Sequence, residues 1–156
     1  MRWLFIATTL MLGGIAHAKV HSGQFGVGLM VGEPSGLSFK LLVDKRHALA
    51  AGLSFSLIDG NLHAHGDYLL HFPGKIHGIQ GGKWIPYVGI GGKLRVWESE
   101  GKKSGESGIG VRIPLGLALH ARGAPVDFFL EFVPGMRILP ETKADFGGAL
   151  GGRWYF

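Results

Sequence analysis

Three histidines and an aspartate share one face of a predicted strand, and these are residue types that metal sites use. His63, His65, Asp67 and His71 all lie at odd positions of the predicted strand, so their side chains point the same way, about 6–7 Å apart per step. A His-x-His pair can bind Zn²⁺ when a third ligand converges on it. No such ligand is identifiable and the chain has no cysteine. We therefore expect hydrogen-bonded polar side chains, no tight zinc site and no cofactor.

Two serines on the preceding predicted strand supply the residue types of a Ser/His/acid hydrolase. Ser54 and Ser56 lie on a face that is otherwise small, beside the strand that carries the histidines. Catalysis requires a mutual geometry that spacing alone does not give, and serine on such a face is commonly just a small residue. The glycine-rich segment 89–93 lacks the spacing of a phosphate loop and no helix follows it. We expect a protein that is not an enzyme, with a lipid-modifying barrel enzyme as the alternative.

The chain around these residues alternates with a period of two and shows little helical periodicity, which predicts strands. Turn residues separate the runs, as Asp59-Gly60 does after the third one. The eight predicted strands are 24–32, 37–43, 47–57, 61–72, 83–97, 108–120, 126–136 and 144–156.

The two faces of these strands differ in side-chain size. In the third strand Leu49, Leu53 and Phe55 alternate with Ala48 and Gly52. A soluble antiparallel sandwich, the other alternative, also alternates, but its second face carries long polar side chains. A small or charged second face fits a crowded interior, and the apolar face is then stable only against lipid. The pattern predicts an all-β, eight-stranded, antiparallel up-and-down transmembrane β-barrel with a side-chain-filled lumen and no open pore.

Charged residues fall on the small face and are expected to line the lumen. An unpaired charge there is costly, so these side chains should pair across strands. Which of them pair does not follow from the sequence. The predicted interior charges are Lys40, Asp67, Lys93, Arg95, Arg112, Asp127, Glu131, Asp145 and Arg153.

The first eighteen residues have the features of a secretory signal peptide. Arg2 precedes an apolar segment, and Ala16-His17-Ala18 is an A-x-A cleavage site. We expect a signal peptide at 1–18 and one barrel domain at 19–156. No later apolar run is long enough for a membrane helix. The formal net charge of +5 is spread over the chain, which gives no indication of nucleic-acid binding and could favour acidic lipid head groups.

The final strand, with aromatics at alternating positions and the end Trp154-Tyr-Phe156, resembles the last strand of bacterial outer-membrane barrels. With the strand count and signal peptide, the chain resembles small OmpA/OmpX-like eight-stranded proteins over residues 24–156. The resemblance implies a monomer in the outer membrane of a Gram-negative bacterium, in contact with outer-membrane lipids. It also implies insertion by the barrel-assembly machinery through the strand ending at Phe156, and a structural or surface-interaction role. Leu150, Trp154 and Phe156 should face lipid, and the last strand should pair with the first.

Overall fold

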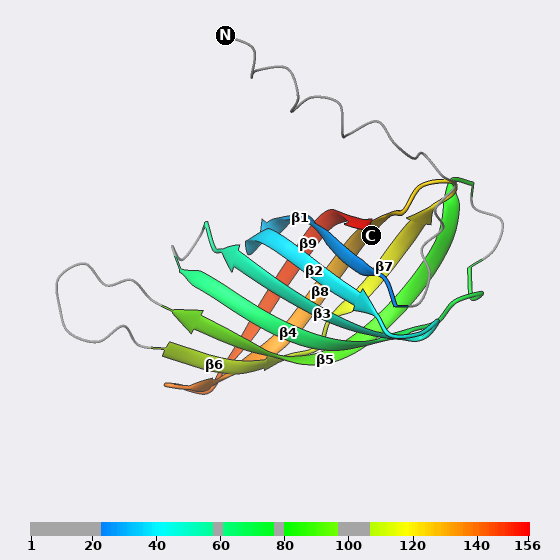
Figure 1. Ribbon diagram of the computed structural model, residues 1–156. Coiled ribbons are helices and arrows are strands. Elements are labelled where there is room, and N and C mark those ends of the chain that lie inside the picture. The colour runs from blue at the N-terminus through cyan, green and yellow to red at the C-terminus, as the bar shows by residue number, and fades with distance from the viewer. Residues whose placement is uncertain (1–22, 58–60, 77–79, 97–106) are drawn as a thin grey trace, which may run out of the picture.

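The computed structural model describes residues 23–57, 61–76, 80–96 and 107–156. Every regular element in this part of the chain is a strand (Figure 1). The described residues contain no helix that is long and apolar enough to cross a membrane. The strands are β1 (Phe25–Glu33), β2 (Ser35–Leu42), β3 (His47–Phe55), β4 (Leu62–His71), β5 (Gly82–Val96), β6 (Ser107–Arg112), β7 (Leu115–Ala121), β8 (Val126–Leu139) and β9 (Lys143–Tyr155).

Antiparallel pairing joins the strands into a closed ring. Each strand pairs with its neighbour in the chain from β1 to β5, β8 pairs with β9, and β9 pairs back with β1 from Gly26↔Tyr155 to Glu33↔Gly148. The short strands β6 and β7 both lie between β5 and β8. They occupy one position in the ring, so the fold is an eight-stranded up-and-down barrel, and the predicted pairing of the last strand with the first is confirmed.

The prediction of one unbroken strand over 108–120 was wrong. The strand is interrupted at Ile113 and Pro114, because a proline has no N–H to give to the ladder. The neighbours stay connected across the break: Gly89 N donates to Pro114 O at 2.8 Å, and Ile113 N donates to Pro134 O at 2.9 Å. The barrel wall is therefore continuous although the strand is not.

Glycine allows β1 and β9 to approach closely where they meet. Gly32 has a φ of +152°, a conformation that residues with a side chain rarely adopt. A Cβ at this position would collide with the carbonyl oxygen of Gly148 on β9. A larger residue at Gly32 would thus push apart the strands that close the barrel.

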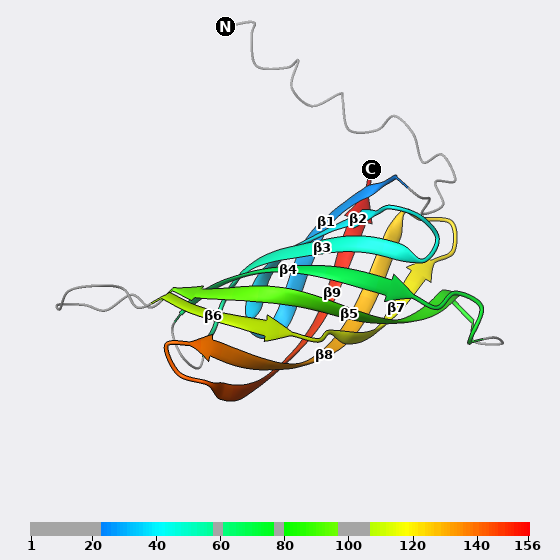
Figure 2. The same ribbon diagram turned by 90° about the horizontal axis from the view of Figure 1, so that it is seen from below.

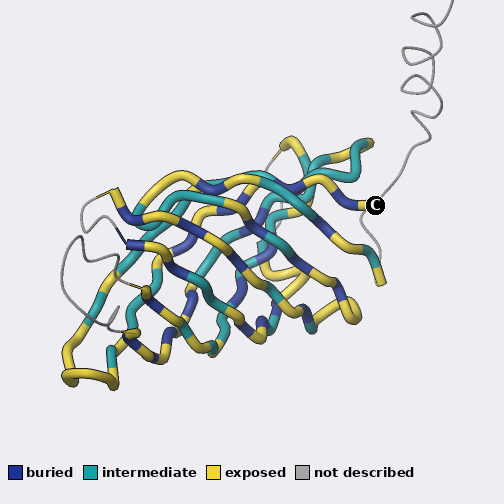
Figure 3. Tube along the Cα trace, turned by 60° about the vertical axis from the view of Figure 1, so that its left-hand side comes forward, coloured by how far each residue is buried: buried dark blue, intermediate teal, exposed yellow. Residues whose placement is uncertain are grey.

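Large apolar side chains are exposed on every strand of the barrel. Buried and exposed positions alternate along the strands (Figure 3). On β1, Leu29 and Val31 are 65 % and 71 % exposed, whereas Met30 between them is 6 % exposed. On the last strand Leu150 and Trp154 are exposed, followed by Phe156, as predicted. A soluble sandwich would bury this face, so that alternative is wrong.

The hairpins divide between the two ends of the barrel (Figure 2). We call one end the proximal end; it holds the β2–β3, β4–β5 and β7–β8 connections. Gly23 and Phe156 also lie there: Gly23 N donates to Leu42 O, and Phe156 N donates to Phe25 O. The distal end holds the β1–β2, β3–β4, β5–β6 and β8–β9 connections. The position of a side chain in the lumen is therefore described below by its distance along the barrel from the proximal or the distal end.

Candidate functional site

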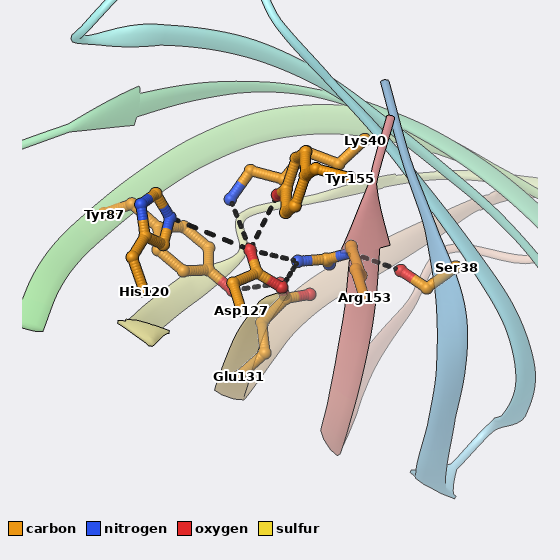
Figure 4. Close-up of polar contacts among 8 residues, drawn as sticks. All are labelled: Ser38, Lys40, Tyr87, His120, Asp127, Glu131, Arg153 and Tyr155. Carbon is orange, nitrogen blue, oxygen red and sulfur yellow. Dashed lines mark hydrogen bonds and ion pairs between the residues drawn. The ribbon is translucent and has the colours of Figure 1, made fainter. Parts of the chain in front are cut away.

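The most deeply buried group of charges surrounds Asp127, near the proximal end (Figure 4). Its Oδ2 atom lies 3.6 Å from Lys40 Nζ, 3.3 Å from Arg153 Nη1 and 3.8 Å from His120 Nε2. The Tyr155 hydroxyl donates to the same oxygen at 2.7 Å. Asp127 and Lys40 are both 0 % exposed. One carboxylate thus holds together side chains from β2, β7, β8 and β9.

Arg153 extends this cluster across the lumen. Its Nε donates to Ser38 Oγ on β2 at 2.9 Å, and its guanidinium carbon lies 3.7 Å from the centre of the Phe129 ring. The inward register of β9 places Arg153 directly opposite Asp127 of β8. A buried guanidinium therefore has a carboxylate, a hydroxyl and an aromatic face as partners, which offset the loss of its hydration.

A second group of charges lies deeper along the barrel, around Arg112. Its Nε is 3.1 Å from Asp67 Oδ1, and its Nη2 donates to Glu131 Oε1 at 2.9 Å. The Tyr87 hydroxyl donates to the other Glu131 oxygen at 2.7 Å. Lys40 Nζ lies 5.1 Å from the centre of the Tyr87 ring, which connects this group to the Asp127 cluster. The two groups form one polar column inside the barrel.

Tyr87→Phe is expected to lower the free energy of unfolding by about 1–3 kcal/mol, because it removes a buried hydrogen bond to a carboxylate. Tyr87 is 3 % exposed and Glu131 is 9 % exposed, so water replaces the hydroxyl poorly. Urea unfolding from lipid vesicles measures the change. Tyr68→Phe is the matched control, since it also removes a hydroxyl that bonds to a side chain, that of His47, but on the exposed outer face, where Tyr68 is 45 % exposed. Equal losses in the two variants would contradict the expected contribution of the buried bond.

A third group lies near the distal end. Lys93 pairs with Asp145, and Arg95 Nη2 lies 3.3 Å from Asp145 Oδ2. The Ser56 hydroxyl donates to the Glu33 carboxylate. A cavity of about 200 Å³ lies between this group and the Arg112 group; charged and histidine side chains at its wall include Glu33, His63, His65, Lys93, Arg95, Arg112, Glu131 and Asp145. Apolar side chains, among them Met30, Val133 and Phe146, complete the wall.

All nine predicted interior charges face the lumen, and each has an oppositely charged partner. The sequence interpretation missed Tyr87, which occupies the same inward register of β5 as Lys93 and could have been found from it. Tyr155 shares the inward register of Arg153 on β9, and its ring is 2 % exposed inside the barrel. Glu33 was missed because the chain is irregular at Gly32, so alternation no longer predicts its direction.

The histidine row lies inside the barrel. His63 and His71 are 6 % and 2 % exposed, and His65 Nε2 lies 3.7 Å from Asp67 Oδ2. In the part of the chain that the structure describes, no three His, Cys, Asp or Glu side chains converge on a position for a metal ion. The expectation that no tight zinc site exists stays a prediction.

The structure brings the two serines close to the histidine strand without forming a hydrolase geometry for Ser54. Ser54 pairs with His63 across β3 and β4, but its hydroxyl is directed to the His63 carbonyl oxygen at 3.5 Å rather than to an imidazole. Ser56 bonds to Glu33. The polar column consists of charges paired between neighbouring strands, as Arg153 with Asp127, and across the lumen, as Lys40 with Asp127.

Comparison with known proteins supports the fold alone. No family model matches the chain, and no curated protein sequence matches it. Its structure is similar to the crystal structure of the N-terminal β-barrel domain of Pseudomonas aeruginosa OprF, with a TM-score of 0.64 and 16 % sequence identity. The similarity covers 86 % of this chain and 98 % of that domain. The closed ring, the outward apolar face and this match together identify an OmpA-like eight-stranded β-barrel fold.

Proposed function

We propose that this protein is an outer-membrane β-barrel of a Gram-negative bacterium, with a structural or surface-interaction role. The observation that carries the proposal is the continuous belt of exposed large apolar side chains around a closed sheet. Such a belt is stable in lipid and would aggregate in water. The similarity to the OprF barrel domain supports the barrel fold on which the proposal rests. The proximal end, which holds Phe156, then faces the periplasm.

The proposal includes a lumen that does not conduct solutes. Support comes from the Asp127 cluster, which fills the lumen with side chains from β2, β8 and β9 that form hydrogen bonds and ion pairs with one another. Apolar side chains pack with them in the same region, among them Leu42, Leu69 and Phe129. An eight-stranded barrel is just wide enough for side chains to fill it. We propose no catalytic role, since the Ser54 hydroxyl is engaged by a backbone carbonyl.

Expression of the full chain in a Gram-negative host tests the location. We expect cleavage after Ala18 and recovery of residues 19–156 in the outer-membrane fraction as a monomer. The folded form should migrate differently from the boiled form on a gel, because a closed barrel resists detergent until heated. An epitope inserted between β5 and β6, at the distal end, should be accessible on intact cells. Recovery as a soluble monomer without detergent would refute the proposal.

Assembly through the last strand is a separate prediction. β9 pairs with β1 from Gly148 to Tyr155, and Phe156 N donates to Phe25 O at 3.0 Å. We expect Phe156→Ala to reduce the amount of heat-modifiable barrel in cells while leaving refolding into lipid vesicles in vitro unchanged. Val126→Ala, at the neighbouring proximal edge of β8, is the control. A loss in both assays would assign Phe156 a role in stability rather than in recognition by the barrel-assembly machinery.

A further inference from the structure

The outer surface of the proximal end is strongly basic. Its exposed cationic side chains come from all three connections at this end, so they are distributed around the rim. We call this set the basic rim; it consists of Lys45, Arg46, Lys75 and Arg122.

Acidic side chains hardly offset this charge. Asp44 is the one exposed acidic side chain that the described residues place at the proximal end. The backbone N–H groups of Arg46 and His47 donate to its Oδ1 at 2.7 and 2.8 Å, and they hold the pKa of Asp44 below its usual range. Asp44 therefore stays ionised, and its carboxylate stabilises the β2–β3 turn by accepting these two hydrogen bonds. No member of the basic rim forms an ion pair with a described residue.

The distal end has no such excess of cations. Arg137 and Lys143 lie there with Glu33 and Glu141. In sequence, the segment joining β5 to β6 contributes more acidic than basic residues: Glu98, Glu100 and Glu106 against Lys102 and Lys103. The charge of the barrel is thus polarised along its axis, with the positive end at the basic rim.

The basic rim begins where the apolar belt ends. Val43 is 52 % exposed and precedes the β2–β3 turn, and Phe72 is 37 % exposed and precedes Lys75. Trp84 follows Lys83 on β5 and points to the outer face, since Ile85 after it is buried. Side chains at this height lie beside lipid head groups, and long cationic side chains can extend toward them along the wall.

We propose that the basic rim binds the phosphate groups of anionic phospholipids in the leaflet at the proximal end of the barrel. This inference rests on the proposed function as a membrane barrel. Guanidinium and ammonium groups are the usual partners of phosphate, and basic residues at a membrane surface attract anionic lipids in a salt-dependent manner. The distribution over three separate connections fits several lipids along the rim rather than one docked acidic protein.

Tryptophan quenching by brominated lipids tests this directly, with Trp84 as the probe. In residues 19–156 the other tryptophans are Trp97 and Trp154. In a Trp97→Phe/Trp154→Phe variant, all tryptophan fluorescence therefore comes from Trp84, beside the basic rim. This variant is refolded into phosphatidylcholine vesicles that contain brominated phosphatidylcholine or brominated phosphatidylglycerol. We expect phosphatidylglycerol to associate about threefold or more strongly than phosphatidylcholine at low salt. The preference should fall toward onefold at about 1 M salt.

A matched pair of variants assigns the preference to the rim. Lys75→Gln/Arg122→Gln removes the exposed cations of the β4–β5 and β7–β8 connections, which flank Trp84 because β5 pairs with β4 and β7 and Arg122 N donates to Gly81 O. Arg137→Gln/Lys143→Gln removes the same residue types at the distal end. The first variant should lose most of the preference and the second should retain it. Heat-modifiable migration verifies that both are folded.

Each outcome has a distinct meaning. Quenching by brominated phosphatidylcholine with no preference for phosphatidylglycerol would overturn this inference and leave the membrane barrel intact. A preference that survives in Lys75→Gln/Arg122→Gln would also overturn it. Absence of quenching by either brominated lipid would refute the membrane barrel itself.

Discussion

Leu29→Arg is expected to lower the free energy of unfolding from a lipid bilayer by about 2–4 kcal/mol. Leu29 is the middle residue of β1, it is 65 % exposed, and its neighbour Leu37 on β2 is also exposed. In water, replacing an exposed leucine by arginine changes stability little, within about 0.5 kcal/mol. In lipid the guanidinium lies at the depth where its hydration is hardest to retain. The substitution therefore distinguishes a lipid-facing wall from a solvent-facing one.

The control for this variant is Val43→Arg. Val43 is 52 % exposed, but it lies at the proximal end, one residue before the turn, where an arginine can reach the head groups. The cost there should be about 0–1 kcal/mol. Urea-dependent folding into vesicles measures both variants by tryptophan fluorescence. Equal costs at the two depths would contradict the placement of the apolar belt in the bilayer.

Asp127→Ala should be the most damaging change in the lumen, with a loss of about 3–5 kcal/mol. The variant leaves Lys40 and Arg153 buried, at 0 % and 3 % exposure, without the carboxylate that both contact. It also removes the acceptor of the Tyr155 hydroxyl. The same unfolding measurement in vesicles reports this loss.

Two further variants test the origin of this loss. Glu141→Ala removes an exposed carboxylate from the β8–β9 connection and should change stability by less than about 0.5 kcal/mol. Lys40→Met in the Asp127→Ala background removes one uncompensated cation, so the double variant should lose less than the sum of the single changes. Strictly additive losses would show that Lys40 and Asp127 are not energetically coupled.

The distribution of residues between lumen and lipid could be predicted from the sequence, because side chains alternate strictly along a strand. Lys40, Arg112 and Glu131 were assigned to the lumen by alternation, and Leu150 and Trp154 to the lipid face. Alternation fails where the backbone departs from regular geometry. Pro114 breaks a strand that was predicted to be continuous, and Gly32 changes the direction of the chain before Glu33.

The pairing of the interior charges could not be predicted, because it depends on the relative shift of strands that are distant in sequence. Asp127 and Arg153 lie opposite each other on paired strands, and that contact requires the β8–β9 register. Lys40 reaches Asp127 from β2, on another part of the wall. This contact depends on the width and shear of the barrel, and the alternation of side chains along each strand predicts neither quantity.

The pairing of β9 with β1 has a consequence for the order of folding. It joins Gly26 to Tyr155, so the seam that closes the ring has the greatest sequence separation of any strand pair in the described barrel. Contacts of this kind form slowly, since the whole intervening chain must be ordered first. Until β9 pairs with β1, the edge of β1 is unpaired and can pair with another chain. The chain therefore needs protection from aggregation until its last strand is available, and closure is expected to be the committing step of its folding.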